Sequence, residues 1–263
     1  MKKRTLIPLL LASSFGLAHA EVKVERIDYQ IDGQPYQGLL VYDDAMTTPR
    51  PGLLMVPNWL GVTDRSAEKA ARAASDKYVV FVADLYGKDV RPKGPEEAGK
   101  VVGPLRADRP LMRQRAQASL DELLKHRDKV NTQQVGAIGF CFGGGAILEL
   151  ARSGAPLSAF VSFHGNLDTP NPADNGNIKG SVLVLHGADD PAVPKQQVDG
   201  FVAAMQETDV DWQLVSYGNA VHSFTDPYAN VPGRNEYNPL VAERAFKAMN
   251  EWLDQAFEHQ THQ

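Results

Sequence analysis

The sequence predicts an α/β fold: a single domain built on one doubly wound, mostly parallel sheet, with an antiparallel hairpin at its N-terminal end. Two observations support this prediction. Short apolar runs alternate with helix-compatible segments from residue 50 onward, and the runs are apolar on both faces, as strands covered by helices on each side must be. No repeat or linker interrupts residues 21–263, so we expect the alternating elements to form one sheet with right-handed crossovers.

The hairpin is expected from two strand-like segments, 22–31 and 36–42, which flank Asp32-Gly33. An Asp-Gly pair favours the tight turn between antiparallel strands. The strands expected after it are residues 52–56, 78–83, 135–140, 159–163, 181–185 and 212–215. The expected helices are residues 64–74, 109–129, 144–152, 195–207 and 240–257. Segments 87–110 and 168–180 contain Pro and Gly, and we expect loops over the sheet there, with room for short helices.

The first twenty residues have the pattern of a secretory signal peptide. Lys2, Lys3 and Arg4 form a charged start, residues 6–17 are apolar, and Ala18-His19-Ala20 offers a cleavage site. The apolar stretch is too short to span a bilayer. We therefore expect residues 1–20 to be removed and the remaining chain, 21–263, to be exported to the periplasm or secreted.

Charge and hydropathy limit the partners that we expect. The signal segment contains three of the 27 basic residues and none of the 32 acidic ones, so the mature chain keeps 24 and 32 and has a formal charge of −8. Phosphate backbones are bound by basic stripes, and a second long apolar run is absent from the sequence. We expect neither nucleic acid nor membrane as a partner, and the sequence gives no oligomeric state.

The strongest motif surrounds Cys141, the only cysteine of the chain. Gly139-Phe140-Cys141-Phe142-Gly143 matches the G-x-S-x-G nucleophile elbow with sulfur in place of oxygen. The nucleophile of an elbow sits on a sharp turn between strand and helix, where flanking side chains would collide. The N-terminus of the following helix then favours a thiolate. Two other interpretations are a small buried hydrophobic residue and a glycine-rich phosphate loop, but the further residues of a phosphate motif are missing.

Two more polar positions follow later strands. Asp189-Asp190 comes after the run 181–185, and His222 comes after the run that begins at Trp212. The order nucleophile, acid, histidine is that of α/β-hydrolases and differs from the orders in chymotrypsin-like and subtilisin-like proteases. In such a triad His222 takes the thiol proton and a carboxylate orients its ring. A turn before Pro191 is the alternative role of the two aspartates.

At this point the sequence resembles the dienelactone hydrolase family of α/β-hydrolases. The matching segments are PNWLG (57–61), ADLYG (83–87), GFCFGG (139–144), GADDPAVP (187–194) and GNAVHSF (218–224). The resemblance implies a Cys141, Asp190 and His222 triad, with Asp190 preferred because the family's acid stands directly before the segment that ends in Val-Pro. It also implies an oxyanion hole formed by the backbone N–H groups of Trp59 and Phe142.

The same resemblance implies a small-molecule ester or lactone as substrate and no cofactor, and the sequence contains no convincing metal-binding pattern. Two positions depart from the well-studied dienelactone enzymes. Asn58 stands where they have a glutamate, and Asp226 stands where they have an arginine for the substrate carboxylate. Dienelactone itself is therefore not the expected substrate. We expect Asn58 and His164 to line the substrate pocket.

These observations leave three functional alternatives. The first is a hydrolase that cleaves esters or lactones through a thioester on Cys141. A thioesterase or a broad carboxylesterase is the second. The third belongs to another class: a non-catalytic thiol redox or binding protein on a hydrolase scaffold, which would need no aspartate and histidine behind the cysteine.

Overall fold

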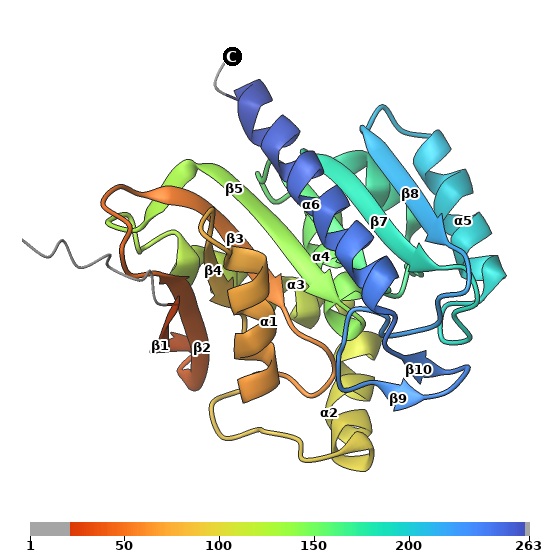
Figure 1. Ribbon diagram of the computed structural model, residues 1–263, viewed down its shortest axis with the longest axis horizontal. Helices are drawn as coiled ribbons and strands as arrows, with labels where there is room; N and C mark the ends of the chain where they lie inside the picture. Colours follow the sequence, from red (N-terminus) through yellow and green to blue (C-terminus); the bar gives the residue numbers. More distant parts are fainter. Residues whose placement is uncertain (1–21, 261–263) are drawn as a thin grey trace, which may run out of the picture.

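The computed structural model describes residues 22–260, so the expected signal peptide, 1–20, lies outside the described residues. An eight-stranded sheet in the order β1-β2-β4-β3-β5-β6-β7-β8 forms the centre of the domain (Figure 1). Its strands are β1 Val22–Ile31, β2 Gln34–Asp43, β3 Arg50–Val56, β4 Val79–Val82, β5 Val130–Phe140, β6 Ala159–Phe163, β7 Ser181–Gly187 and β8 Trp212–Tyr217. The strands from β4 to β8 are parallel, and β1 and β2 are antiparallel. The predicted fold class is confirmed.

The hairpin turns at the predicted place. Asp32 and Gly33 connect β1 and β2, and their φ angles of 50° and 76° are both positive. A two-residue turn with two positive φ angles matches the twist of the strands that it joins, and Asp-Gly tolerates it well. The hairpin then extends the parallel sheet through the antiparallel pairing of β2 with β4.

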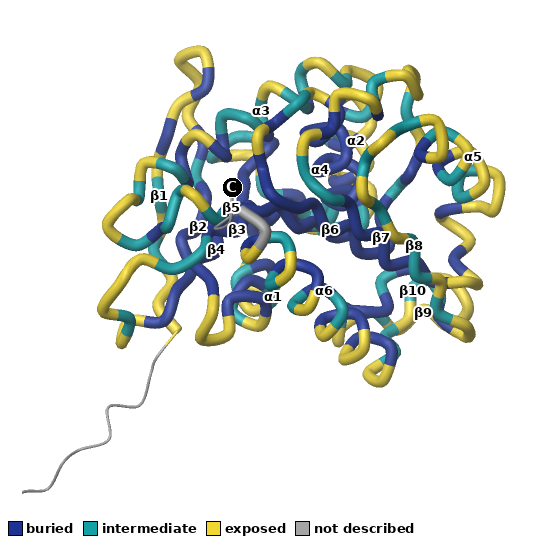
Figure 2. The backbone as a smooth tube through the Cα atoms, turned by 90° about the horizontal axis from the view of Figure 1, so that it is seen from above, coloured by how far each residue is buried: buried dark blue, intermediate teal, exposed yellow. Residues whose placement is uncertain are grey.

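Helices cover both faces of the sheet (Figure 2). One layer contains α1 Asp64–Ala74 and α6 Pro239–Gln260, and the other contains α2 Pro95–Ala107, α3 Arg109–Leu123, α4 Phe142–Arg152 and α5 Lys195–Gln206. Each face has its own cluster of buried apolar side chains. This two-sided burial is why a central strand such as β4 is apolar and buried in every position, whereas the edge strand β1 alternates between exposed and less exposed residues.

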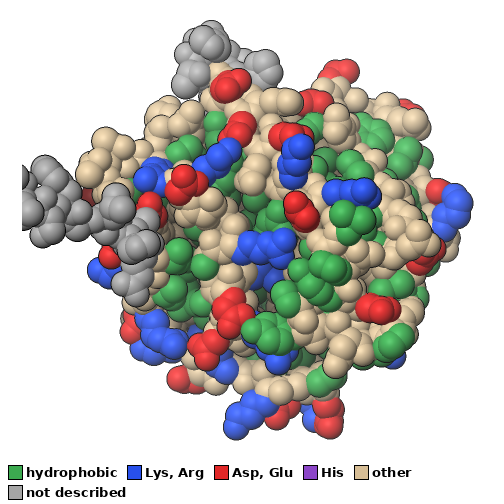
Figure 3. Space-filling view, in the orientation of Figure 1, with side chains coloured by type: hydrophobic (Ala, Val, Ile, Leu, Met, Phe, Trp, Pro, Cys, Tyr) green, Lys and Arg blue, Asp and Glu red, His purple; other side chains and the backbone are tan. Residues whose placement is uncertain are grey.

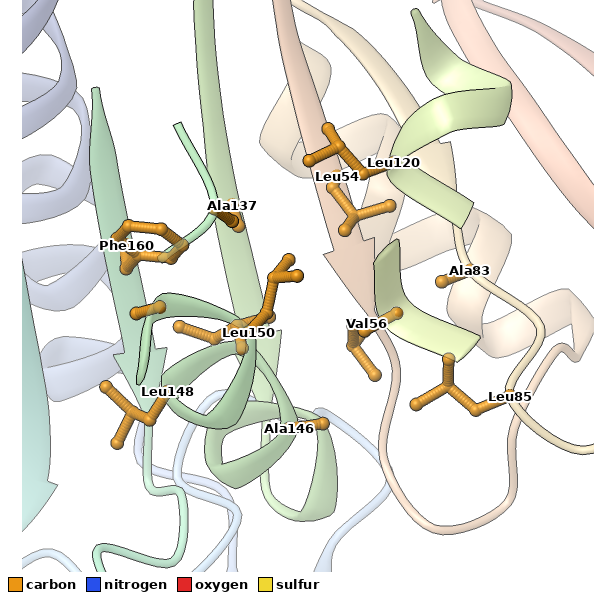
Figure 4. Packing of buried hydrophobic residues seen from close by; sticks show 14 of the residues in the cluster. Leu54, Val56, Ala83, Leu85, Leu120, Ala137, Ala146, Leu148, Leu150 and Phe160 are labelled. Atoms are coloured by element: carbon orange, nitrogen blue, oxygen red, sulfur yellow. The ribbon is translucent and has the colours of Figure 1, made fainter. Parts of the chain in front are cut away.

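The most buried helix is α4, which begins directly after Cys141. All eleven of its residues are buried. Its Ala146, Leu148 and Leu150 belong to the same cluster of buried apolar side chains as Ala137 of β5 and Phe160 of β6 (Figure 4). Its two charged residues, Glu149 and Arg152, are buried as an ion pair at 2.9 Å. Protein therefore encloses α4 on every side, and this enclosure fixes the start of α4 beneath the cysteine.

Three segments differ from the predicted elements. The segment 87–110 contains the thirteen-residue helix α2, which buries Ala98, Val102 and Leu105, although only short helices were expected there. Helix α3 ends at Leu123 rather than at residue 129, because the chain turns back through residues 124–129 to start β5 at Val130. The short strands β9 Asn230–Val231 and β10 Asn235–Glu236 were not expected. The 3-10 helix η1 Pro172–Asn177, by contrast, lies in segment 168–180, where short helices were expected.

The parallel strands end at one edge of the sheet, which therefore collects the residues that follow them. Cys141 follows β5, His164 follows β6, Asp190 follows β7 and His222 follows β8. Ligands of open parallel sheets bind at this edge. Within residues 22–260 there is no helix with both the length and the apolar character needed to cross a membrane.

Candidate active site

Cys141 lies on a strained turn between β5 and α4, with φ 56° and ψ −119°. Glycine is needed on both sides of it for steric reasons. A Cβ atom at Gly139 would lie 2.2 Å from the carbonyl oxygen of Gly143, and one at Gly143 would lie 2.0 Å from the carbonyl oxygen of Val56. Non-glycine residues at positive φ persist only where the surrounding structure holds them, and they concentrate at functional sites.

The three residues of the expected triad lie in one hydrogen-bonded line. His222 Nε2 is 3.0 Å from Cys141 Sγ, and His222 Nδ1 is 2.8 Å from Asp190 Oδ2. Both Asp190 and His222 are buried, whereas Cys141 as a residue is partly exposed. The sulfur can therefore meet a substrate while its two partners are shielded from water.

Of the adjacent aspartates, only Asp190 faces the histidine. Its other carboxylate oxygen, Oδ1, accepts the backbone N–H groups of Ala192 at 2.8 Å and Val193 at 3.3 Å. Asp189 is exposed in the turn before Pro191. The two N–H donors fix the rotation of the Asp190 carboxylate, so that Oδ2 points at His222.

The electrostatics of the site favour an ion pair between sulfur and imidazole. Burial would lower the pKa of His222, but the hydrogen bonds with Asp190 and Cys141 outweigh it and raise that pKa to about 10. Burial would likewise raise the pKa of Cys141, but the hydrogen bond and the charge of His222, helped by the backbone N–H of Phe142, lower it below its ordinary value. The arrangement therefore stabilises a thiolate beside an imidazolium.

Trp59 and Phe142, the expected oxyanion-hole residues, are held together by a tyrosine. Phe142 is the first residue of α4, and the hydrogen bond of its backbone N–H lowers the pKa of the Cys141 thiol. The Tyr86 hydroxyl donates to the carbonyl oxygen of Trp59 at 2.9 Å, and its ring stacks on Phe142 at 6.0 Å between ring centroids. Sequence reasoning treated Tyr86 only as part of the ADLYG segment, because nothing in the linear pattern shows this double contact.

The two expected pocket residues lie in different surroundings. Asn58 is partly exposed and lines a small cavity with Tyr86 and Phe142, and its Oδ1 accepts the N–H of Leu60 at 3.0 Å. His164 is only 2% exposed and lies behind Cys141, with its ring 5.3 Å from that of His222. The contacts of His164 are thus with the candidate nucleophile and its neighbours.

A second cavity, of about 90 Å³, lies beside the site, between α1 and the loop that follows His222. Asn58, Lys69, Thr225 and Asp226 are among its lining residues. Asp226 Oδ1 accepts the N–H of Tyr228 at 3.0 Å. No cluster of three or more His, Cys, Asp or Glu side chains suited to a metal ion occurs in the part of the chain that the structure describes.

The fold and the line from cysteine to histidine to aspartate define an α/β-hydrolase. The sequence profile of the dienelactone hydrolase family matches residues 37–257. The chain therefore belongs to the dienelactone hydrolase family. Family membership makes it a hydrolase that acts on carboxylic esters or lactones.

Individual relatives agree with this assignment. The solved structure named m3DLH is 39% identical, with a TM-score of 0.84, over 90% of this chain and 99% of that chain. A dienelactone hydrolase-like promiscuous phosphotriesterase from metagenomic libraries is 37% identical, also with a TM-score of 0.84 and the same coverage. A protein of Saccharolobus solfataricus, provisionally named carboxymethylenebutenolidase, is 24% identical over 87% of this chain and 97% of its own length.

Proposed function

We propose that the protein hydrolyses esters or lactones through a triad of Cys141, His222 and Asp190, with a thioester intermediate. The observation that carries this proposal is the pair of contacts made by the His222 ring, 3.0 Å to Cys141 Sγ and 2.8 Å to Asp190 Oδ2. A nucleophile, a base and a group that orients the base, each within hydrogen-bond reach, are what covalent acyl transfer requires.

In the proposed reaction the Cys141 thiol gives its proton to His222 Nε2, and the sulfur attacks the carbonyl carbon. The oxyanion of the tetrahedral intermediate is stabilised by backbone N–H groups, for which we propose those of Phe142 and Trp59. The carbon–oxygen bond of the ester then breaks, and His222 protonates the departing alkoxide. Water, deprotonated by His222, attacks the thioester, releases the carboxylic acid and restores the thiol.

The carboxylate of Asp226 favours neutral esters over anionic ones, in a cavity whose other charged lining residues are Arg65, Glu68, Lys69 and Arg72. Figure 3 shows acidic and basic side chains mixed on the face of the molecule that carries α1. Asp226, at the position of the arginine in the well-studied dienelactone enzymes, lines the neighbouring cavity. A unit anion about 6 Å from its carboxylate would be repelled by roughly 3 kcal/mol at an effective dielectric near 20. We therefore expect neutral esters to have a higher kcat/KM than carboxylate-bearing lactones of similar size.

The experiment compares p-nitrophenyl esters of short acids with a carboxylate-bearing lactone, using the native protein and Cys141→Ala. The alanine variant should lose turnover while keeping its melting temperature, since only one sulfur at a partly exposed turn is removed. Rapid quenching followed by mass spectrometry should find the acyl group on Cys141. Near-normal turnover by Cys141→Ala would refute the proposal, and so would an acyl group on another residue.

A second candidate activity is the hydrolysis of neutral phosphotriesters. The observation in its favour is the 37% identity to the promiscuous phosphotriesterase, which extends over 90% of this chain. Such substrates carry no net charge, so Asp226 would not repel them. Adding paraoxon to the substrate panel tests this candidate, and it is rejected if paraoxon neither turns over nor labels Cys141.

We also propose that the mature protein is exported after removal of residues 1–20. The charged start, the apolar run 6–17 and Ala18-His19-Ala20 support this proposal. N-terminal sequencing of the protein from a periplasmic fraction should begin at Glu21. Recovery of the chain in the cytoplasm with Met1 or Lys2 at its N-terminus would contradict it.

A further inference from the structure

His164 is a buried titratable side chain that the proposed reaction does not use. It is the first residue after β6, has a φ of 40° and is 2% exposed. Its Nδ1 accepts the backbone N–H of Cys141 at 3.2 Å. The same N–H also donates to the carbonyl oxygen of Phe163 at 3.0 Å. The strained turn at the cysteine is thus held from behind by two acceptors that are adjacent in sequence.

The other ring nitrogen of His164 fixes its tautomer. Because Nδ1 accepts from Cys141, its proton must be on Nε2, and Nε2 lies 2.8 Å from the hydroxyl oxygen of Thr225. That hydroxyl is in turn 3.5 Å from Lys69 Nζ. A line of contacts therefore runs from Lys69 on α1 through Thr225 and His164 to the backbone of Cys141.

The surroundings of His164 oppose a positive charge on its ring. Phe140 and Phe224 contribute neighbouring rings, at 6.2 and 5.0 Å between centroids. Burial lowers the pKa of His164 well below its ordinary value, and His222, Lys69 and His186 lower it further by repulsion. A neutral ring is also what the geometry needs, because a protonated Nδ1 would point its hydrogen at the N–H of Cys141.

We propose that His164, held by Thr225 and Lys69 in its neutral Nε2–H tautomer, is a positioning residue that fixes the turn of Cys141 and so aims the sulfur at His222. This inference rests on the proposed role of Cys141 as nucleophile. The backbone of Cys141 is left-handed, and a residue other than glycine keeps that strained conformation only where its surroundings hold it. The carbonyl oxygen of Phe163 and Nδ1 of His164 hold it by accepting the N–H of Cys141. Of these two acceptors, only His164 Nδ1 loses its ability to accept when it is protonated.

Substitutions at two positions test the proposal through activity. Asparagine at 164 retains an acceptor near the Nδ1 position and tolerates positive φ, so His164→Asn should keep kcat within about tenfold. His164→Leu lacks the acceptor, and its kcat should fall on the order of 100-fold, with KM nearly unchanged, because the sulfur is misplaced. Thr225→Val should lower kcat about tenfold, and Thr225→Ser, its matched control, should not.

A readout independent of activity is the NMR spectrum of protein with ¹⁵N-labelled histidine. His164 should show the neutral Nε2–H tautomer from about pH 5 to 9, a range in which an ordinary histidine titrates. Lys69→Met removes one of the opposing cations, so any titration of His164 should move to higher pH. The tautomer is the discriminating result, because a His164 ring that only filled space would not need an unprotonated Nδ1 beside the N–H of Cys141.

The outcomes separate this inference from the proposed function. If Cys141→Ala is inactive while His164→Leu and Thr225→Val keep the native kcat, the positioning role is wrong and the triad stands. A charged or Nδ1–H ring at neutral pH would also overturn the role. If His164→Leu does not fold, the Thr225 pair and the spectrum still decide the matter. Full activity of Cys141→Ala would instead refute the triad.

Discussion

Replacing Asp190 by asparagine changes one atom of the proposed triad and reverses a hydrogen bond. Asp190 Oδ1 accepts the N–H groups of Ala192 and Val193, and its Oδ2 faces His222 Nδ1 at 2.8 Å. The amide oxygen of an asparagine must keep the two N–H donors, so its NH₂ group turns toward His222. Nδ1 then has to accept, and the ring proton moves to Nε2, where it opposes the thiol.

The size of the effect follows from the burial of the pair. His222 is 6% exposed, so water cannot replace the lost carboxylate. An imidazolium and a carboxylate whose charges are about 4 Å apart attract each other by about 4 kcal/mol at an effective dielectric of 20. Each 1.36 kcal/mol corresponds to about tenfold in rate. We therefore expect kcat for Asp190→Asn to fall by about three powers of ten, close to the roughly 10⁴-fold loss known for the equivalent protease change.

The assay is steady-state hydrolysis of p-nitrophenyl acetate, with kcat and KM determined separately. Asp189→Asn is the matched control, because the exposed neighbour undergoes the same chemical change without facing His222. KM should change little in either variant, since the carboxylate does not touch the substrate. Comparable activity of the two variants, or a larger loss in Asp189→Asn, would show that Asp190 does not orient the histidine.

Four further predictions concern the thiol and its turn. Cys141→Ser should lower kcat about a hundredfold or more in the same assay, because His222 would have to deprotonate a far less acidic group. The dependence of kcat/KM on pH should be bell-shaped. It should rise as Cys141 ionises, at a pH below the ordinary cysteine pKa, and fall near pH 10, where His222 loses its proton. The pH midpoint of alkylation by iodoacetamide should lie below the ordinary cysteine pKa of ~8.5, and Asn58→Glu should raise this midpoint. A native midpoint at or above ~8.5 that the glutamate leaves unchanged would contradict this expectation. Gly143→Ala should destabilise the protein by about 3 kcal/mol in urea unfolding, since its Cβ would lie 2.0 Å from the carbonyl oxygen of Val56.

The strands could be predicted from the sequence because burial on both faces of the sheet requires apolar side chains in them. Each parallel strand contains an apolar run of a length that suits a strand. The observed bounds differ from the expected ones at both ends: β3 and β5 begin earlier, at residues 50 and 130, and β7 and β8 end later, at residues 187 and 217. Helix α2 was missed for a physical reason. Gly99, Gly103 and Pro104 lie inside it, and each normally disfavours a helix interior. The tertiary burial of Ala98, Val102 and Leu105 outweighs those preferences.

The candidate site shows a similar division. The two glycines around Cys141 are local sterics, so the sequence carries them directly. The order of Cys141, Asp190 and His222 follows from the strands that precede them. By contrast, the contact between Cys141 and His164 joins residues 23 apart, and those from Thr225 to His164 and Lys69 span 61 and 156 residues. No periodicity or motif links these positions, because only the packing of α1 and the loop after β8 against the sheet brings them together.

The two neighbouring histidines should leave opposite marks on the stability of the protein as the pH changes. The pKa of His222 is raised to about 10, so its contribution is present below pH 6.5 and is lost as the pH rises toward 10. The pKa of His164 is held well below 6.5, so the unfolded chain binds a proton there that the folded protein does not, and stability falls as the pH drops below 6.5.

Asparagine at 164 cannot titrate. The free energy of unfolding of the native protein, relative to His164→Asn, should therefore fall by about 1.4 kcal/mol for each pH unit below 6.5 and stay constant above it. Urea unfolding of both proteins between about pH 5 and 8 measures this difference, and a flat difference across pH 6.5 would mean that His164 can be protonated inside the folded protein, which the line of contacts from Lys69 to Cys141 does not allow.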